Sequence, residues 1–153
     1  MRVLLDTNIL TRLANPAQVE LHDVAEASVD ALRKMGHVPS LLPQNLYEFW
    51  VVATRPSDVN GLGMTIEEVR DELNSLLSLF HVLQDERAIF PRWLDLVTDY
   101  AAQGKAAHDA RLVAGMLRHG LSHLLTFNDG DFARYDQITV VTPPTLAAGA
   151  TAL

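Results

Sequence analysis

The chain has 153 residues, a length that fits one compact domain with a sizeable core of its own. Apolar residues make up 48% of it and charged residues 20%, which is an ordinary globular composition and excludes a disordered chain. The absence of cysteine excludes disulfides, thiolate metal sites and cysteine nucleophiles, and the net charge of −7 argues against a protein that binds nucleic acid only by neutralising phosphates.

Short apolar segments typical of strands alternate along the chain with longer segments typical of helices. We expect strands at residues 2–5, 37–43, 81–85, 122–127 and 138–143. We expect helices at residues 9–14, 19–35, 44–55, 65–80, 87–102 and 107–119, the fourth of them opened by a Thr-x-x-Glu capping box. This alternation predicts an α/β domain with a mainly parallel sheet that helices cover on both faces.

Nothing along the chain suggests an internal domain boundary, so we expect one domain over residues 1–145 and a C-terminal tail of small residues over 146–153. The sequence opens on a strand-like segment without the basic and apolar regions of a secretory signal. It also lacks the run of about eighteen apolar residues that a membrane span needs. These features favour a cytoplasmic protein that makes no use of a membrane.

Acidic and amide residues follow two of the expected strands. Asp6 comes directly after residues 2–5, within the segment LLDTNIL, and Asn128, Asp129 and Asp131 come after residues 122–127. In parallel sheets, ligands bind beyond the carboxyl ends of the strands. Both stretches therefore lie where a ligand site is expected.

Two further acids, Glu48 and Asp109, fall within expected helices. Apolar residues follow each at i+3 and i+4, valines after Glu48 and Leu112 and Val113 after Asp109, so each acid lies on or beside an apolar stripe. An ionised carboxylate near a core is costly unless it is paired or binds a metal. A shared cation would explain these chain-distant acids together, and Mg²⁺, with Mn²⁺ as a substitute, is the cation that carboxylate oxygens suit.

Four segments in order resemble the motifs of PIN-domain ribonucleases, and most closely those of the VapC-type toxins of bacterial toxin–antitoxin pairs. The segments are LLDTNIL, LYEFW, HDARLVA and LLTFNDGDFARY, and the resemblance extends from about Arg2 to Pro143. Each motif alone is weak, whereas four in the family's order and spacing are specific. The resemblance implies a PIN-like three-layer α/β/α sandwich and a Mg²⁺-dependent endoribonuclease that leaves a 5′-phosphate and a 3′-hydroxyl.

The resemblance also implies roles for particular residues. Asp6, Glu48 and Asp109 match the family's metal-binding catalytic acids, and Thr7 matches a polar contact to the metal or a water. In such a site a bound ion would polarise the phosphodiester and activate the attacking water. The implied partners are an RNA substrate, a cognate antitoxin protein and a second copy of the chain in a homodimer.

The fourth metal-binding position is less sharply defined. The family varies between acid and amide in this part of the last motif, and an acid commonly precedes its phenylalanine. Asp131, supported by Asn128, matches those places best, and Asp129 occupies a position that the pattern leaves loose. We therefore expect Asp131 to complete the site, with Asp129 as the reserve candidate.

Each acid also has a purely structural interpretation. Asp6 would cap the helix that follows it, and Glu48 would pair with Arg55 or another basic residue. Asp109 would stabilise the first turn of its helix, and acids are common in turns such as the one at residues 128–131.

Basic residues near the acids have two interpretations as well. His108 is a candidate general base or an ordinary solvated histidine. Four basic residues would contact RNA phosphates or serve as ordinary surface charge: Lys105, Arg111, Arg118 and Arg134.

Three other functions stay open at this stage. The same chemistry would serve a PIN-domain nuclease that processes RNA without a toxin role. An inactive PIN-like module that binds RNA or protein is a second alternative, although the full set of acids argues against it. A phosphotransferase or receiver-like protein with Asp6 as nucleophile would need a late lysine or threonine, and the late motif here is acidic instead.

Overall fold

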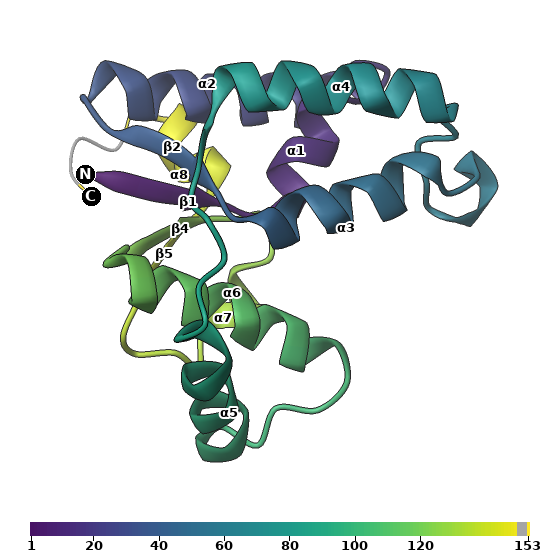
Figure 1. The fold of residues 1–153 in the computed structure, drawn as a ribbon. Coiled ribbons are helices and arrows are strands. Elements are labelled where there is room, and N and C mark those ends of the chain that lie inside the picture. The colour runs from purple at the N-terminus through teal and green to yellow at the C-terminus, as the bar shows by residue number, and fades with distance from the viewer. Residues whose placement is uncertain (150–152) are drawn as a thin grey trace.

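The computed structural model describes residues 1–149 and 153, and its centre is a five-stranded sheet (Figure 1). The strands are β1 (Arg2–Leu5), β2 (Val38–Leu41), β3 (His81–Val82), β4 (His123–Leu125) and β5 (Thr139–Val141). They lie in the order β3-β2-β1-β4-β5, and every neighbouring pair is parallel. The predicted α/β class with a central parallel sheet is confirmed.

Helices cover both faces of this sheet and complete three layers (Figure 1). One face is covered by α1 (Thr7–Leu13), α2 (Val19–Lys34), α3 (Pro43–Thr54), α4 (Ile66–Leu79) and α8 (Pro143–Ala147). The opposite face is covered by α5 (Ile89–Asp99), α6 (Lys105–His119) and α7 (Asp129–Phe132). A short 3-10 helix, η1 (Ser57–Val59), follows α3. None of the helices in the described residues is long and apolar enough to cross a membrane.

Alternating side chains of the central strands supply the two cores. Val3 and Leu5 of β1 pack into the core under α1 to α4, whereas Leu4 packs into the core under α5 and α6. Leu125 and Leu124 of β4 divide in the same way. Because both faces are buried, these strands read in the sequence as continuous apolar runs.

Strand β1 lies where the order of the strands in the sheet reverses. The chain leaves β1 for β2 on one side, and its later strands β4 and β5 continue the sheet on the other side. The backbone N–H of Asp6 donates to the carbonyl of Leu125 at 2.9 Å, which ties the ends of β1 and β4 together. The carboxyl end of β1 is therefore the switch point at which open parallel sheets bind ligands.

Several predicted boundaries were wrong for identifiable reasons. Helix α6 begins at Lys105 rather than at residue 107, after Gly104 with its positive φ of 58°, so Asp109 lies beyond the first turn. The strand expected to reach Pro143 ends at Val141, because Pro143 begins α8, where the missing N–H of proline costs no helical hydrogen bond. The strand expected over residues 81–85 has two residues.

The short helices α7 and α8 were not expected. Helix α8 crosses the expected boundary between residues 145 and 146, and its Leu146 is buried in the core under α2. Residues 150–152 of the expected tail lie outside the described residues. The division into a domain and a tail stays a prediction.

Helix α6 lies unusually close to the segment that leads into α3. A side-chain carbon added at Gly115 of α6 would lie 2.6 Å from the Cδ1 atom of Leu42, which is closer than real contacts allow. Leu42 is fully buried and is the residue that precedes α3. The absence of a side chain at Gly115 therefore permits the packing of the two helices that carry Asp109 and Glu48.

Candidate active site

Asp6 follows β1 and caps α1, with 7% of its surface exposed. Its Oδ1 atom accepts a hydrogen bond from the backbone N–H of Thr7 at 2.8 Å. Its Oδ2 atom accepts one from the hydroxyl of Thr126 at 2.7 Å and one from the amide of Asn8 at 3.1 Å. The capping interpretation is correct, and the further donors hold the carboxylate in one orientation.

Glu48 lies half-buried on α3, and neutral donors orient both of its oxygens. The hydroxyl of Thr7 donates to Oε2 at 2.6 Å, and the amide of Gln44 donates to Oε1 at 2.8 Å. Among the ion pairs of the described residues, none involves Glu48, so the interpretation that pairs it with Arg55 or another basic residue was wrong. Glu48 is oriented without being neutralised.

Gln44 links α3 to α6. Its amide nitrogen also donates to the backbone carbonyl of His108 at 2.8 Å, and its amide oxygen accepts from Arg111 at 3.1 Å. Arg111 in turn forms an ion pair of 3.1 Å with Asp85. This chain of contacts fixes Glu48 relative to the helix that carries Asp109.

Asp109 lies half-buried on α6, where a lysine approaches it. The Nζ atom of Lys105 lies 3.5 Å from Oδ2 of Asp109 and 3.3 Å from Oδ2 of Asp131 on α7. Lys105 therefore bridges one predicted catalytic acid of α6 and the predicted fourth acid.

One cavity of about 910 Å³ collects most of the predicted residues. It is lined by Asp6, Thr7, Glu48, Asp109 and Asn128, together with Lys105, His108, Arg111 and the apolar side of α3 at Val51 and Val52. Asp131 does not line this cavity and reaches it only through Lys105. Asp129 lines a separate cavity of about 380 Å³ beside β5, away from the other acids.

The acids around this cavity affect one another electrostatically. Burial, together with the nearby charges of Glu48 and Asp109, raises the pKa of Asp6 from 3.8 to about 6, although the hydrogen bonds from Thr126 and Thr7 oppose the rise. Burial is also the main cause that raises the pKa of Asp109, with Lys105 opposing it and the charges of Asp131 and Glu48 adding to it. Carboxylates that raise each other's pKa would be relieved by a bound cation.

The donor set fits a hard divalent cation. Within the described residues, only His22, Asp23 and Glu26 have three ligand atoms all within 4.8 Å of one another. The oxygens of Asp6, Glu48 and Asp109 are therefore spaced more widely around their cavity. Oxygens bound directly to one Mg²⁺ lie about 2.0–2.1 Å from it, so at this spacing some of the three acids would contact the ion through the waters that Mg²⁺ keeps.

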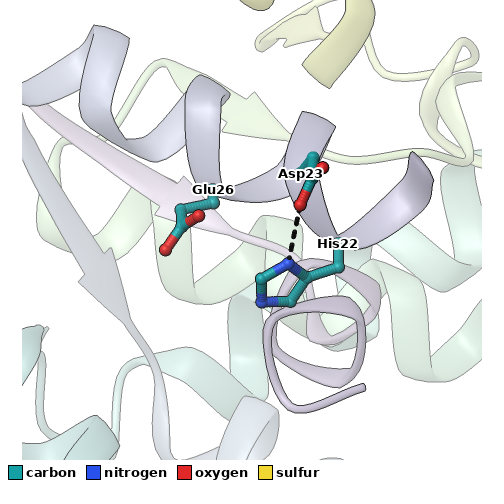
Figure 2. A group of neighbouring side chains, drawn as sticks. All are labelled: His22, Asp23 and Glu26. Atoms are coloured by element: carbon teal, nitrogen blue, oxygen red, sulfur yellow. Dashed lines mark hydrogen bonds and ion pairs between the residues drawn. The ribbon is translucent and has the colours of Figure 1, made fainter. Parts of the chain in front are cut away.

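The compact group of His22, Asp23 and Glu26 lies on α2 (Figure 2), and none of the three lines the cavity that Asp6, Glu48 and Asp109 share. The Nδ1 atom of His22 lies 3.1 Å from a carboxylate oxygen of Asp23, and Asp23 and Glu26 are both exposed. Glu26 follows His22 by four residues and Asp23 by three, and such pairs are neighbours on any helix without help from the fold. The closeness of these three residues therefore follows from their spacing on one helix, although His22 is half-buried.

The residues that orient the acids were not predicted from the sequence. Gln44, Thr126 and Asn8 contact Asp6 or Glu48 directly, and Gln44 and Thr126 are buried. A signal was present for two of them, because Asn8 and Thr126 are polar residues inside otherwise apolar segments. Gln44 carries no such signal, since its partners on α6 are more than sixty residues away along the chain.

Comparison with known proteins places the chain among characterised folds. A model of the PIN domain family matches residues 3–138. The comparison of this chain with curated protein sequences gave no match.

Three solved structures are similar over nearly their whole length. VapBC2 from Rickettsia felis, bound to a DNA fragment from its promoter, shares 16% identity over 93% of this chain and 98% of its own, with a TM-score of 0.70. A toxin–antitoxin complex from Klebsiella pneumoniae shares 25% identity over 92% and 97%, with a TM-score of 0.64. VapBC-1 from nontypeable Haemophilus influenzae shares 15% identity over 94% and 99%, with a TM-score of 0.68.

Proposed function

Because the chain belongs to the PIN domain family, we propose that it is a metal-dependent endoribonuclease and the toxin of a toxin–antitoxin pair. The observation that carries the proposal is the common cavity. Asp6 reaches it from the end of β1, Glu48 from α3 and Asp109 from α6, so acids more than forty residues apart line one space at the switch point of the sheet.

The chemistry would follow from the way these residues are held. Asp6, Glu48 and Asp109 would bind Mg²⁺, or Mn²⁺ in its place, and such an ion polarises a phosphodiester and lowers the pKa of an attacking water. Thr7 donates to Glu48 from the side chain and to Asp6 from the backbone, so one residue orients two acids. Asn128 lines the same cavity and would contact the substrate or a water.

We assign the fourth position to Asp131 rather than to Asp129. Asp131 is joined to Asp109 through Lys105, whereas Asp129 lines the separate cavity beside β5. Asp131 is therefore the acid of the last motif that is linked to one of the other three, Asp109.

The toxin role rests on the structural neighbours, of which the Klebsiella pneumoniae structure is a toxin–antitoxin complex and the other two are VapBC2 and VapBC-1. By analogy, a cognate antitoxin would bind this chain and suppress its activity, and the active form would be a homodimer. A small open reading frame next to the gene would favour this role over general RNA processing.

The proposal is tested by RNA cleavage with purified protein and Mg²⁺. Wild-type protein should cut single-stranded RNA, and chelation of the metal should stop it. Asp6→Asn and Asp109→Asn should each abolish cleavage while the far-UV circular dichroism stays unchanged. Asp23→Asn on α2 is the matched control and should cut at the wild-type rate. Wild-type cleavage by the Asp6 variant would show that the site is elsewhere.

A further inference from the structure

Lys105 occupies an unusual position at the edge of the cavity. It is the first residue of α6, its ammonium lies within 3.5 Å of oxygens of both Asp109 and Asp131, and its side chain is 74% exposed. We propose that Lys105 is the counter-ion of these two acids in the metal-free protein and that binding of a divalent cation releases it to hold an RNA phosphate. This inference rests on the proposed function.

The position of Lys105 is poor for stability. A cation at the start of a helix opposes the helix dipole, and a lysine that precedes its acid by four residues is the weaker order of such a pair. The exposure of the lysine also lets water and salt screen its two ion pairs. These contacts contribute little to the fold, and a divalent cation would displace the ammonium easily.

The other cations that line the cavity differ from Lys105. Arg111 is engaged by Asp85 and by Gln44, neither of which is a proposed metal ligand. Arg55 stands at the end of α3. Lys105 alone among these three forms ion pairs with acids that the metal would take.

Release of the ammonium would place a positive charge where a polyanion needs it. A bound divalent cation would offset the negative charges of Asp109 and Asp131, so the electrostatic attraction that holds Lys105 between them would weaken. The lysine is the first residue of α6, and residues 105, 108 and 109 of this helix line the cavity. A flexible ammonium at that place suits contact with a phosphate, and phosphate contacts position a nucleic acid without reading its sequence.

The chain offers a direct measurement, because it contains only two lysines, Lys34 and Lys105. Protein labelled with ¹³C at the lysine ε-carbon should give two side-chain signals, assigned with Lys105→Met. Titration with Mg²⁺ alone should move the Lys105 signal toward the position of an exposed lysine and leave the Lys34 signal in place. A Lys105 signal that does not move at saturating Mg²⁺ would overturn the exchange.

Binding measurements test separately the two parts of the proposal, the competition of Lys105 with the metal and its contact with an RNA phosphate. Without the competing ammonium, Lys105→Met should bind Mg²⁺ about twofold to fivefold more tightly by calorimetry, as the loss of exposed ion pairs implies. It should bind a single-stranded RNA about tenfold more weakly in Ca²⁺, which we use as a cation that supports binding without cleavage. Lys34→Met is the matched control and should change neither constant.

The opposite results would be decisive. Weaker Mg²⁺ binding by Lys105→Met would mean that the lysine only orients the acids, and unchanged RNA binding would mean that it does not reach a phosphate. Failure of the proposed function can be told apart from failure of the lysine exchange. A protein that cuts no RNA would still show the movement of the Lys105 signal on addition of Mg²⁺.

Discussion

Two groups of potential metal-ligating side chains in this molecule, one on α2 and one around the cavity, differ in how the fold brings their members together. The group on α2, His22, Asp23 and Glu26, brings its ligand atoms within 4.8 Å of one another (Figure 2). The cavity group of Asp6, Glu48 and Asp109 is spaced more widely. Proximity on α2 follows from helix geometry alone, whereas proximity around the cavity needs the whole fold. Burial and fixed orientation therefore distinguish the cavity group from the α2 group, whose ligand atoms are nevertheless closer together.

The largest difference should appear in activity when the same change is made in both groups. Glu48→Gln should lower kcat/KM for RNA cleavage by at least about a hundredfold, because it removes a charge that would bind the metal. Glu26→Gln should leave kcat/KM unchanged. Steady-state kinetics on a defined RNA measures kcat/KM for both variants. Equal losses in the two variants would contradict the expectation that cleavage depends on the cavity group and not on the α2 group.

The second difference concerns stability and pH. The raised pKa of Asp6 means that the folded protein binds more protons than the unfolded chain between about pH 4 and pH 6. The free energy of unfolding of metal-free protein should therefore fall as pH rises through that window and stay low above it. The contribution of Asp6 is on the order of 3 kcal/mol at most.

Asp6→Asn should lose this part of the pH dependence. Urea unfolding at pH 4, 5, 6 and 7 in the presence of a chelator measures it. Mg²⁺ should raise the stability of wild-type protein at pH 7 and not that of the variant. A wild-type slope that persists in Asp6→Asn would assign the pH dependence to other groups.

A smaller effect is expected from the contacts that orient the acids. Thr7→Val removes the hydroxyl that donates to Glu48 at 2.6 Å and accepts from Asn45 at 3.4 Å. Loss of a residue that orients a metal ligand typically costs tenfold to a hundredfold, so we expect Mg²⁺ affinity and cleavage to fall by roughly tenfold. Thr7→Ser should keep most of both. An inactive serine variant would indicate a packing role for the methyl group.

The smallest effect should come from the α2 group itself. His22→Ala removes the exposed contact to Asp23, and surface changes of this kind shift the free energy of unfolding by about 0.5 kcal/mol or less. Thermal denaturation with and without Zn²⁺ measures the change. A Zn²⁺-dependent rise in Tm that His22→Ala abolishes would make the α2 group a metal site and overturn the comparison.

The sequence predicted most of the fold because its signals are local. Apolar runs marked the five strands, and periodicity marked α1 to α6. Helices α7 and α8 have four and five residues, which is too short for a helical period to appear. The start of α6 was placed two residues late because the small, polar residues before Ala107 carry no periodic signal.

The candidate site was predicted only as far as its acids. Asp6, Glu48 and Asp109 stand out because each is an acid among apolar residues. The turn that holds Asp129 and Asp131 contains acids in both places, so only the tertiary structure separates them. The contact of Gln44 with α6 is set by packing between distant segments, which no local pattern records.

The close packing at Gly115 has a consequence for variation in this protein. Because a methyl group there would collide with buried Leu42, alanine at this position would force α6 and the start of α3 to separate or Leu42 to repack. These helices carry Asp109 and Glu48, so a separation would change the spacing of these two acids around their cavity although no polar atom had been replaced. A loss-of-function screen that recovers Gly115→Ala with every acid intact would show that the two helices separate, whereas a fully active Gly115→Ala would show that Leu42 repacks.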